Sequence, residues 1–290
     1  LLATAVERPL AATATGWDWY HVRAEKLEVL VKLYIAIAYS FGHFFMCPNR
    51  IPWCFLPGRQ GWQTYFGPAE AYAPLYQFVR RNRALFDGYA AVEQVGVVYS
   101  NLMFRRGNRE VEKVCRRLLD AQVPLGIALA GDDWLADRLA NEKLGRFRYL
   151  VTPSPGVLDP EQESVLQPYR DKGRAIAYQQ VGELLARIPR LVRIDGTSRV
   201  WALPRRKAGG GPGSLVVHLI NWDYDFSKET IRPKREFALF LHSELLGETR
   251  PRNPVLVPVD GQERKIDCVQ HTDGYSFAIP ELSLWSLLKV

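Results

Sequence analysis

The chain has 290 residues, and 47% of them are hydrophobic, which is enough to build a core and excludes a disordered chain. Its net charge of +7 comes from 38 basic and 31 acidic residues mixed along the chain, so we expect no nucleic-acid partner. No apolar run approaches the roughly eighteen residues that cross a bilayer, so we expect no membrane span. The chain starts at Leu1 without a signal pattern, and its localisation stays unknown.

The first segment, residues 1–90, is rich in aromatic residues and has long irregular stretches. A short strand is predicted at 10–15, a helix at 25–40, a buried strand at 44–47 and a loop at 49–67. Pro68 then opens a helix that runs to about residue 86, because proline is tolerated in a first helical turn. The helix at 25–40 is apolar nearly all round, so it must be covered on more than one side.

The middle segment, residues 91–190, alternates short apolar strands with helices. Strands are predicted at 95–100, 125–130, 149–152 and 174–178. Helices are predicted after Asn108, at 134–144, after Asp159 and at 181–187. This alternation favours a parallel sheet covered on both faces, in a flavodoxin-like arrangement.

The last segment, residues 191–290, loses the helical period. Strands are predicted at 191–194, 200–203, 215–221, 236–241, 255–259, 266–271, 275–279 and 284–290. The glycine-rich stretch at 205–213 is interpreted as a hairpin loop. Many short strands separated by turns indicate an antiparallel β-sandwich, so the whole chain is predicted to be α/β plus all-β.

No cofactor or metal site is evident in the sequence. The turn after the first strand of the middle segment, SNLMFRRG at 100–107, lacks both the dinucleotide and the P-loop glycine patterns. Cys47 and Cys54 do not have a usual zinc spacing, and no second pair completes a site. We expect buried free thiols, with a Cys47–Cys54 disulfide as the alternative in an exported protein. Asp132 and Asp133 are expected to cap the helix that follows them.

Two aromatic clusters follow the predicted strands of the first segment. Trp17 and Trp19, with His21, come after the strand at 10–15, and Trp53 comes after the strand at 44–47. In a (β/α)8 barrel the carboxyl ends of the strands carry the active site. Flat rings with polar edges suit the apolar faces and hydroxyl rims of sugars, whereas the alternative is packing against the next domain. Asn49 and Arg50 lie near enough in sequence to donate hydrogen bonds to hydroxyl groups.

Several strings resemble glycoside hydrolases related to the family 42 β-galactosidases. AIAYSFGHFFMCP at 36–48, YFGP at 65–68, YAPLYQFVR at 72–80 and LFDGY at 85–89 resemble the end of their catalytic barrel. The middle segment is similar to their flavodoxin-like trimerisation domain. VHLINWDYD at 217–225 and IPELSLW at 279–285 are similar to their closing β-sandwich. The resemblance covers nearly the whole chain.

This resemblance implies a retaining glycosidase with an oligo- or polysaccharide substrate and two carboxylates about 5 Å apart. The acid/base would lie upstream of Leu1, and the nucleophile is expected near Thr15. The sequence has Asp18 there instead of the usual glutamate, so Asp18 is the catalytic candidate of this chain. The resemblance also implies a homo-oligomer formed through the flavodoxin-like domain.

Two hypotheses follow. In the first, the chain is the C-terminal portion of such a hydrolase, with the last barrel elements at 1–90, a flavodoxin-like domain at 91–190 and a sandwich at 191–290, and it is inactive without the N-terminal part of the barrel. In the second, it is a non-catalytic carbohydrate-binding or assembly protein with the same architecture. A free-standing flavodoxin-like binding module is a third and weaker interpretation.

Overall fold

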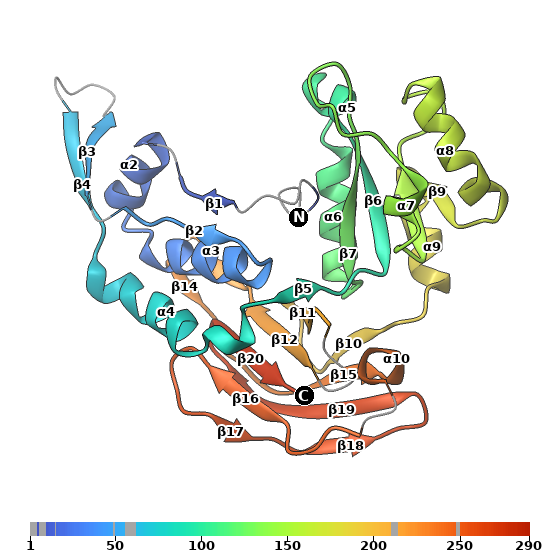
Figure 1. Cartoon of the computed structure of the whole chain (residues 1–290). Coiled ribbons are helices and arrows are strands. Elements are labelled where there is room, and N and C mark those ends of the chain that lie inside the picture. The colour runs from blue at the N-terminus through green and yellow to red at the C-terminus, as the bar shows by residue number, and fades with distance from the viewer. Residues whose placement is uncertain are drawn as a thin grey trace.

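The computed structural model describes residues 5, 10–14, 16–48, 50–55, 62–209, 214–247 and 250–290, with the backbone alone at 16–17, 50–55 and 62–66. The first and middle segments lie side by side, and both rest on the strands of the last segment (Figure 1). Among the described helices, none has the length and apolar character needed to cross a membrane.

Two short parallel strands lie at the centre of the first segment. β1 (Ala11–Ala12) pairs with β2 (Phe44–Phe45), and α2 (Gly16–Ala24) and α3 (Glu28–Ser40) connect them. The predicted strand–helix–strand order at 10–47 is therefore present. The chain continues through α4 (Ala69–Arg81), the 3-10 turn η1 (Arg83–Leu85) and β5 (Tyr89–Ala91).

The prediction of a loop at 49–67 is wrong. The structure has an antiparallel hairpin there, formed by β3 (Arg50–Phe55) and β4 (Trp62–Phe66). The glycine and proline residues that suggested a loop are concentrated at 57–61, between the two strands. The flanking stretches are rich in aromatic and β-branched residues, which favour strands.

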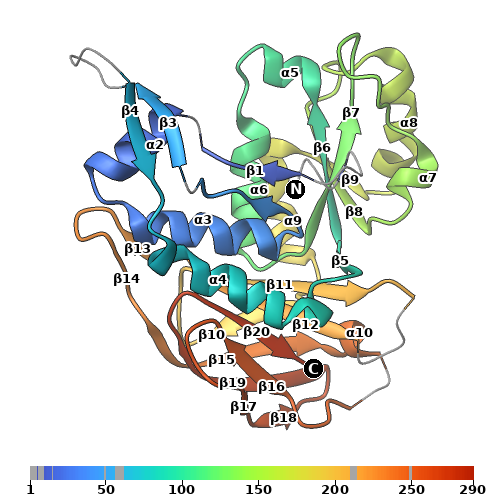
Figure 2. The same ribbon diagram turned by 60° about the vertical axis from the view of Figure 1, so that its left-hand side comes forward.

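The middle segment contains a parallel sheet with helices on both faces (Figure 2). Its strands are β6 (Val95–Ser100), β7 (Leu125–Ala130), β8 (Tyr149–Thr152) and β9 (Ala175–Ala177), in the order β7-β6-β8-β9. Its helices are α5 (Asn101–Arg105), α6 (Glu110–Asp120), α7 (Asn141–Leu144), α8 (Pro160–Asp171) and α9 (Val181–Arg187), with the 3-10 turn η2 (Tyr178–Gln180) before α9. Buried side chains place α6 and α9 on one face, and α7 and α8 on the other.

The prediction of a helix at 134–144 is also wrong, because only its last turn, α7, is helical. The chain folds back at Gly131, whose N–H donates to the carbonyl of Asp137. The Asp132 carboxylate accepts from the N–H groups of Trp134 and Leu135, so it caps a tight turn and not a helix. A Cβ at Gly131 would lie 2.0 Å from the Leu135 carbonyl oxygen, so only glycine fits this turn.

The last segment forms two antiparallel sheets. One has the order β10-β15-β19-β18, from β10 (Val192–Asp195), β15 (Lys234–His242), β19 (Gly274–Leu282) and β18 (Cys268–Gln270). The other has the order β17-β16-β20-β12-β11-β5, from β17 (Arg264–Lys265), β16 (Val255–Pro258), β20 (Trp285–Lys289), β12 (Leu215–Asn221) and β11 (Val200–Lys207), with β5 from the first segment. Side chains of both sheets share one core cluster. The remaining elements are the hairpin of β13 (Tyr224–Asp225) and β14 (Thr230–Ile231), and helix α10 (Ser243–Leu246).

The three segments share a further core cluster. It contains Leu33 and Phe78 from the first segment, Leu118 from the middle segment, and Trp201 and Trp285 from the last. Cys47, Cys115 and Cys268 are free thiols, as expected, but each is only partly buried. The side chain of Cys54 lies outside the described part of the structure. Burial raises the pKa of Cys47 and of Cys115 to about 12.

His218 on β12 is completely buried at this junction. Its ring lies 5.3 Å from that of Phe86 and 5.9 Å from that of Trp285. The Ser40 hydroxyl donates to the carbonyl of Ala36, so it accepts from Nδ1 of His218 at 3.2 Å. Nε2 of His218 has no partner among the described residues. Burial, with the nearby Arg205 cation, lowers the pKa of His218 well below its ordinary value.

We expect the stability of the protein to fall as the pH drops below about 6.5, the pKa of an unfolded histidine. Below this pH the unfolded chain binds a proton at His218, whereas the buried side chain in the folded protein stays neutral. The free energy of unfolding therefore falls by about 1.4 kcal/mol per pH unit, down to the folded pKa. When the free energy of unfolding is measured with urea between pH 5 and 8, it should change less steeply with pH in His218→Gln than in wild type. His21→Gln, on the surface of α2, is the control, and equal slopes for wild type and His218→Gln would contradict this account.

Candidate functional site

The candidate site is the region around the carboxyl ends of β1 and β2. One face of this parallel pair is buried, with Phe45 packed against α3, whereas Phe44 and Met46 on the other face are 52% and 53% exposed. Leu10, just before β1, is 46% exposed. Parallel strands are normally covered on both faces, so this pair presents an uncovered apolar face.

Helix α2 begins directly after β1 and carries three of the residues predicted from the sequence. Asp18 lies exposed in its first turn, where a carboxylate also complements the helix dipole. Asp18 contributes to the raised pKa of Tyr34 on α3, after the larger effect of burial. His21 points to Glu25, in the turn directly after this helix, with Nδ1 3.3 Å from Oε1.

Trp19 lies in the core. Its side chain has no exposed surface and packs edge-on against Phe45, with ring centroids 6.3 Å apart. A ring in this position offers no face to a sugar in the structure described. Asp18 is exposed and Trp19 is buried because residues one position apart point to different sides of a helix.

The other predicted residues follow β1 and β2 as expected, but their side chains lie outside the described part of the structure. Trp17 is in α2, and Arg50 and Trp53 are in β3. Asn49 lies outside the described residues altogether. Helix α2 packs against β3 and β4, so the two stretches that carry the aromatic residues are neighbours. The structure therefore brings the predicted elements together without giving the positions of these side chains.

The N-terminus of α3 is held by a carboxylate from the last segment. Helix α3 has no side-chain cap of its own. Glu229, between β13 and β14, accepts from the N–H of Val29 at 3.0 Å and from the N–H of Leu30 at 3.1 Å. The Tyr224 hydroxyl donates to the same carboxylate at 3.1 Å. An anion at this position satisfies free N–H groups and complements the positive end of the helix dipole.

The C-terminus of α3 is held by a cation from the same segment. Arg205 on β11 is 7% exposed, and its Nη1 donates to the Ser40 carbonyl at 3.3 Å. Its Nη2 donates to the carbonyl of Tyr89. Gly42 leaves room for it: the residue has φ +81°, and a Cβ there would lie 2.5 Å from Nη2 of Arg205. Burial lowers the pKa of Arg205 to about 10, so it stays charged at neutral pH.

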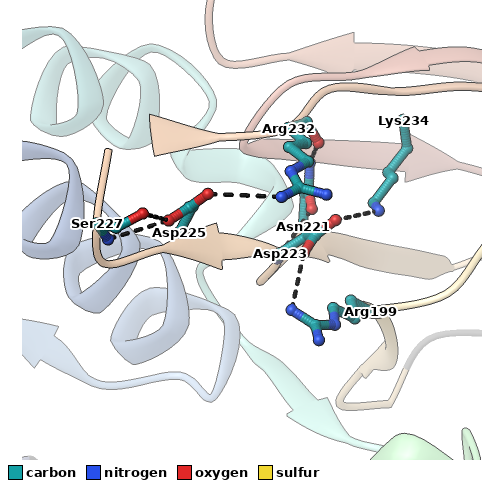
Figure 3. Close-up of polar contacts among 7 residues, drawn as sticks. All are labelled: Arg199, Asn221, Asp223, Asp225, Ser227, Arg232 and Lys234. Atoms are coloured by element: carbon teal, nitrogen blue, oxygen red, sulfur yellow. Dashed lines mark hydrogen bonds and ion pairs between the residues drawn. The ribbon is translucent and has the colours of Figure 1, made fainter. Parts of the chain in front are cut away.

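The motif NWDYD at 221–225 builds the hairpin that carries Glu229 (Figure 3). Asn221 is buried, and its amide donates to the carbonyls of Arg232 and Ser283 at 2.7 and 2.8 Å. Asp223 lies between Lys234 and Arg199, at 2.6 and 3.0 Å. These contacts, led by the hydrogen bond from Lys234, hold the pKa of Asp223 below its usual range.

Asp225 closes the turn of this hairpin. It accepts from the backbone N–H and the hydroxyl of Ser227, at 3.0 and 2.6 Å, and lies 3.5 Å from Arg232. Every carboxylate of the motif is therefore engaged in shaping the hairpin. Neither Glu229 nor Arg205 could be predicted from the sequence, since each contacts a helix far away in the chain and neither has a local motif.

Comparison with known proteins relates the chain to glycoside hydrolases. No protein-family model matches it. An alpha-agarase from Thalassotalea agarivorans is 25% identical over 228 residues, which is 76% of this chain and 15% of that protein. An alpha-agarase from Alteromonas agarilytica is 25% identical over 298 aligned positions, which is 99% of this chain and 20% of that protein. The chain thus spans only a small part of the curated relatives it matches.

A solved structure is similar in fold. Alpha-L-fucosidase isoenzyme 2 from Paenibacillus thiaminolyticus has a TM-score of 0.57 and 10% identity, over 90% of this chain and 57% of that one. This structural likeness concerns the fold alone. The similarity to the two alpha-agarases supports a glycoside hydrolase relationship, and it does not point specifically to the family 42 β-galactosidases. The structure is a mixed α/β architecture with parallel and antiparallel sheets, and its fold is similar to part of that fucosidase.

We expect Glu229→Gln to lower the free energy of unfolding by about 1 kcal/mol, because the helix loses a charged cap but keeps one acceptor oxygen. The measurement is chemical unfolding at low and high salt, and the difference should shrink as salt screens the charge. Glu263→Gln, at an exposed position of the last segment, is the matched control. A Glu229→Gln protein as stable as wild type at low salt would show that this cap contributes nothing.

Proposed function

We propose that the chain is the C-terminal portion of a carbohydrate-active glycoside hydrolase and supplies the last strands of its catalytic barrel. The observation that carries this proposal is the parallel pair β1–β2 with an uncovered apolar face, in a chain similar to alpha-agarases over most of its length. A (β/α)8 barrel needs eight strands, and further strands would cover Phe44 and Met46.

The segment boundaries fit this proposal. Residues 1–90 would be the end of the barrel, 91–190 a flavodoxin-like domain and 191–290 a β-sandwich. The strand order β7-β6-β8-β9 agrees with the flavodoxin-like order, in which the first strand lies between the second and the third. The two antiparallel sheets with a common core support the sandwich. Oligomerisation through the flavodoxin-like domain belongs to the same proposal.

The substrate proposed is a galactan of the agar type, after the names of the two relatives. In a retaining mechanism two carboxylates flank the scissile bond, and one of them becomes covalently bound to the sugar. We propose that the acid/base lies in the rest of the barrel and that Asp18, exposed after β1, is the carboxylate this chain offers to the pocket. Trp17, Trp53, Asn49, Arg50 and His21 would contact sugar units around it.

A second candidate function is a non-catalytic carbohydrate-binding or assembly protein. The observation in its favour is that the carboxylate after β1 is an aspartate in the first turn of a helix, a position that also serves helix stability.

The first test compares a protein extended through the upstream reading frame with the 290-residue chain, using agar and reducing-end release. We expect hydrolysis by the extended protein, loss of activity in its Asp18→Asn variant, and none from the shorter chain, because the mechanism needs both carboxylates. Binding of agar by the extended protein without hydrolysis would favour the non-catalytic candidate. Hydrolysis by the 290-residue chain alone would refute the proposed division of the site.

The second test separates sugar-binding rings from core rings. In the extended protein, Trp17→Ala and Trp53→Ala should each weaken agar-oligosaccharide binding by about tenfold, with a nearly unchanged melting temperature. Trp19→Ala is the contrast: loss of a fully buried ring should cost about 3–5 kcal/mol of stability. If Trp17→Ala and Trp53→Ala destabilise the protein as Trp19→Ala does and bind normally when folded, those rings are core as well.

A further inference from the structure

A cleft lies where the end of α6 meets the turn between β10 and β11. Its volume is about 620 Å³, within the range of about 300–1,000 Å³ typical of small-molecule sites. Three arginines line it, Arg190, Arg193 and Arg199, together with Thr197, Ser198 and Trp222. Among the described residues, none from the first segment lines this cleft, so it is separate from the candidate site at β1 and β2.

Each arginine makes hydrogen bonds within the protein and still has N–H groups available for a ligand. Arg190 donates to the carbonyls of Ala121 and Leu185, at 2.8 and 2.9 Å. Arg193 uses its Nε for Asp195, and Arg199 uses one terminal nitrogen for Asp223. A guanidinium has five N–H groups, so several remain available on side chains whose orientation is already fixed. The side chains of Arg193 and Arg199 are 50% and 55% exposed.

The carboxylates near the cleft are already engaged by cations. Asp120 accepts from Nε of Arg116 and from the indole N–H of Trp201, both at about 3.0 Å. Asp223 is shared between Arg199 and Lys234. Arg190 has no carboxylate partner among the described residues, and so the cleft carries an excess of positive charge that favours an anion.

Neutral donors complete the lining. Thr197 and Ser198 add two hydroxyl groups from the turn. Arg199 has φ +57°, a left-handed conformation that non-glycine residues rarely adopt and that often marks a functional position. Fixed guanidinium groups beside hydroxyls suit a ligand with both an anionic group and sugar hydroxyls.

We propose that this cleft binds a saccharide unit that carries a sulfate or carboxylate group. The arginines would pair with the anionic group, for which their planar donor geometry is suited, and Thr197 and Ser198 would contact ring hydroxyls. The inference rests on the proposed function for the saccharide nature of the ligand. It adds a second binding site, away from the barrel, through which the protein would recognise the charged units of a polysaccharide.

The test is isothermal titration calorimetry of the 290-residue chain with a sulfated galactan oligosaccharide, its desulfated counterpart and inorganic sulfate. The sulfated oligosaccharide should bind at least tenfold more tightly than either of the others. Arg193→Gln and Arg199→Asn should each weaken it by roughly tenfold, since a charge-assisted hydrogen bond is lost. Asparagine is chosen at 199 because it tolerates the left-handed backbone.

Arg235→Gln is the matched control, because Arg235 also pairs with a carboxylate, Glu281, but lies outside the cleft. Melting temperatures of all variants establish that they are folded, and Arg199→Lys tests geometry at constant charge in case the asparagine variant is unstable. Equal binding of the sulfated and desulfated oligosaccharides, or unchanged binding in folded variants of both Arg193 and Arg199, would overturn the proposal. Inorganic sulfate that binds as tightly as the oligosaccharide would overturn its saccharide part. Agar hydrolysis by the extended protein is a separate readout, so either proposal can fail alone.

Discussion

Helix α3 is held between two opposite charges that come from the same distant part of the chain. The Glu229 carboxylate lies at its N-terminus and the Arg205 guanidinium at its C-terminus, 200 and 165 residues away in sequence. Both signs match the helix dipole, and each side chain also satisfies backbone groups that the helix leaves unpaired. Since β1 and β2 pack on α3 through Val31, Ile35 and Phe45, this clamp fixes where the strands of the candidate site lie.

The contacts of Glu229 with α3 explain why the carboxylates of the NWDYD motif at 221–225 have a structural role. Asp223 and Asp225 are each bound by donors of their own neighbourhood, and Asn221 ties the hairpin to two other loops. A catalytic carboxylate must keep an oxygen free for a substrate, and these two have cationic or hydroxyl partners at short distance. Their contacts determine the shape of the hairpin, which places Glu229 at the N-terminus of α3. Asp18 lies elsewhere, exposed in the first turn of α2 after β1.

Local signals predicted most elements, and their failures have physical causes. The apolar runs at 95–100, 125–130 and 215–221 coincide with β6, β7 and β12, because buried strands need nothing beyond their own side chains to be recognised. The helix predicted at 134–144 failed because Gly131 and Asp132 build a turn from backbone contacts that no periodicity reveals. At the site, spacing placed Asp18 and Trp19 together, but only packing shows that one is exposed and the other buried. Glu229 and Arg205 could not be predicted, since their contacts cross the chain.

The shared core joins the first segment firmly to the C-terminal sheets. β5 leaves the first segment and joins the outer edge of a sheet of the last segment, beside β11. Arg205 lies on that same strand β11, and its contacts reach the carbonyls of both Ser40 and Tyr89. The first segment is thus tied to the C-terminal sheets by backbone pairing, by a buried cation and by the ring cluster of Phe86, His218 and Trp285. Such a junction cannot slide, because a shift of β5 would break its strand register and strip the partners from a buried charge. The C-terminal sheets therefore act as the base on which β1 and β2 are positioned, and the geometry of the candidate site depends on them.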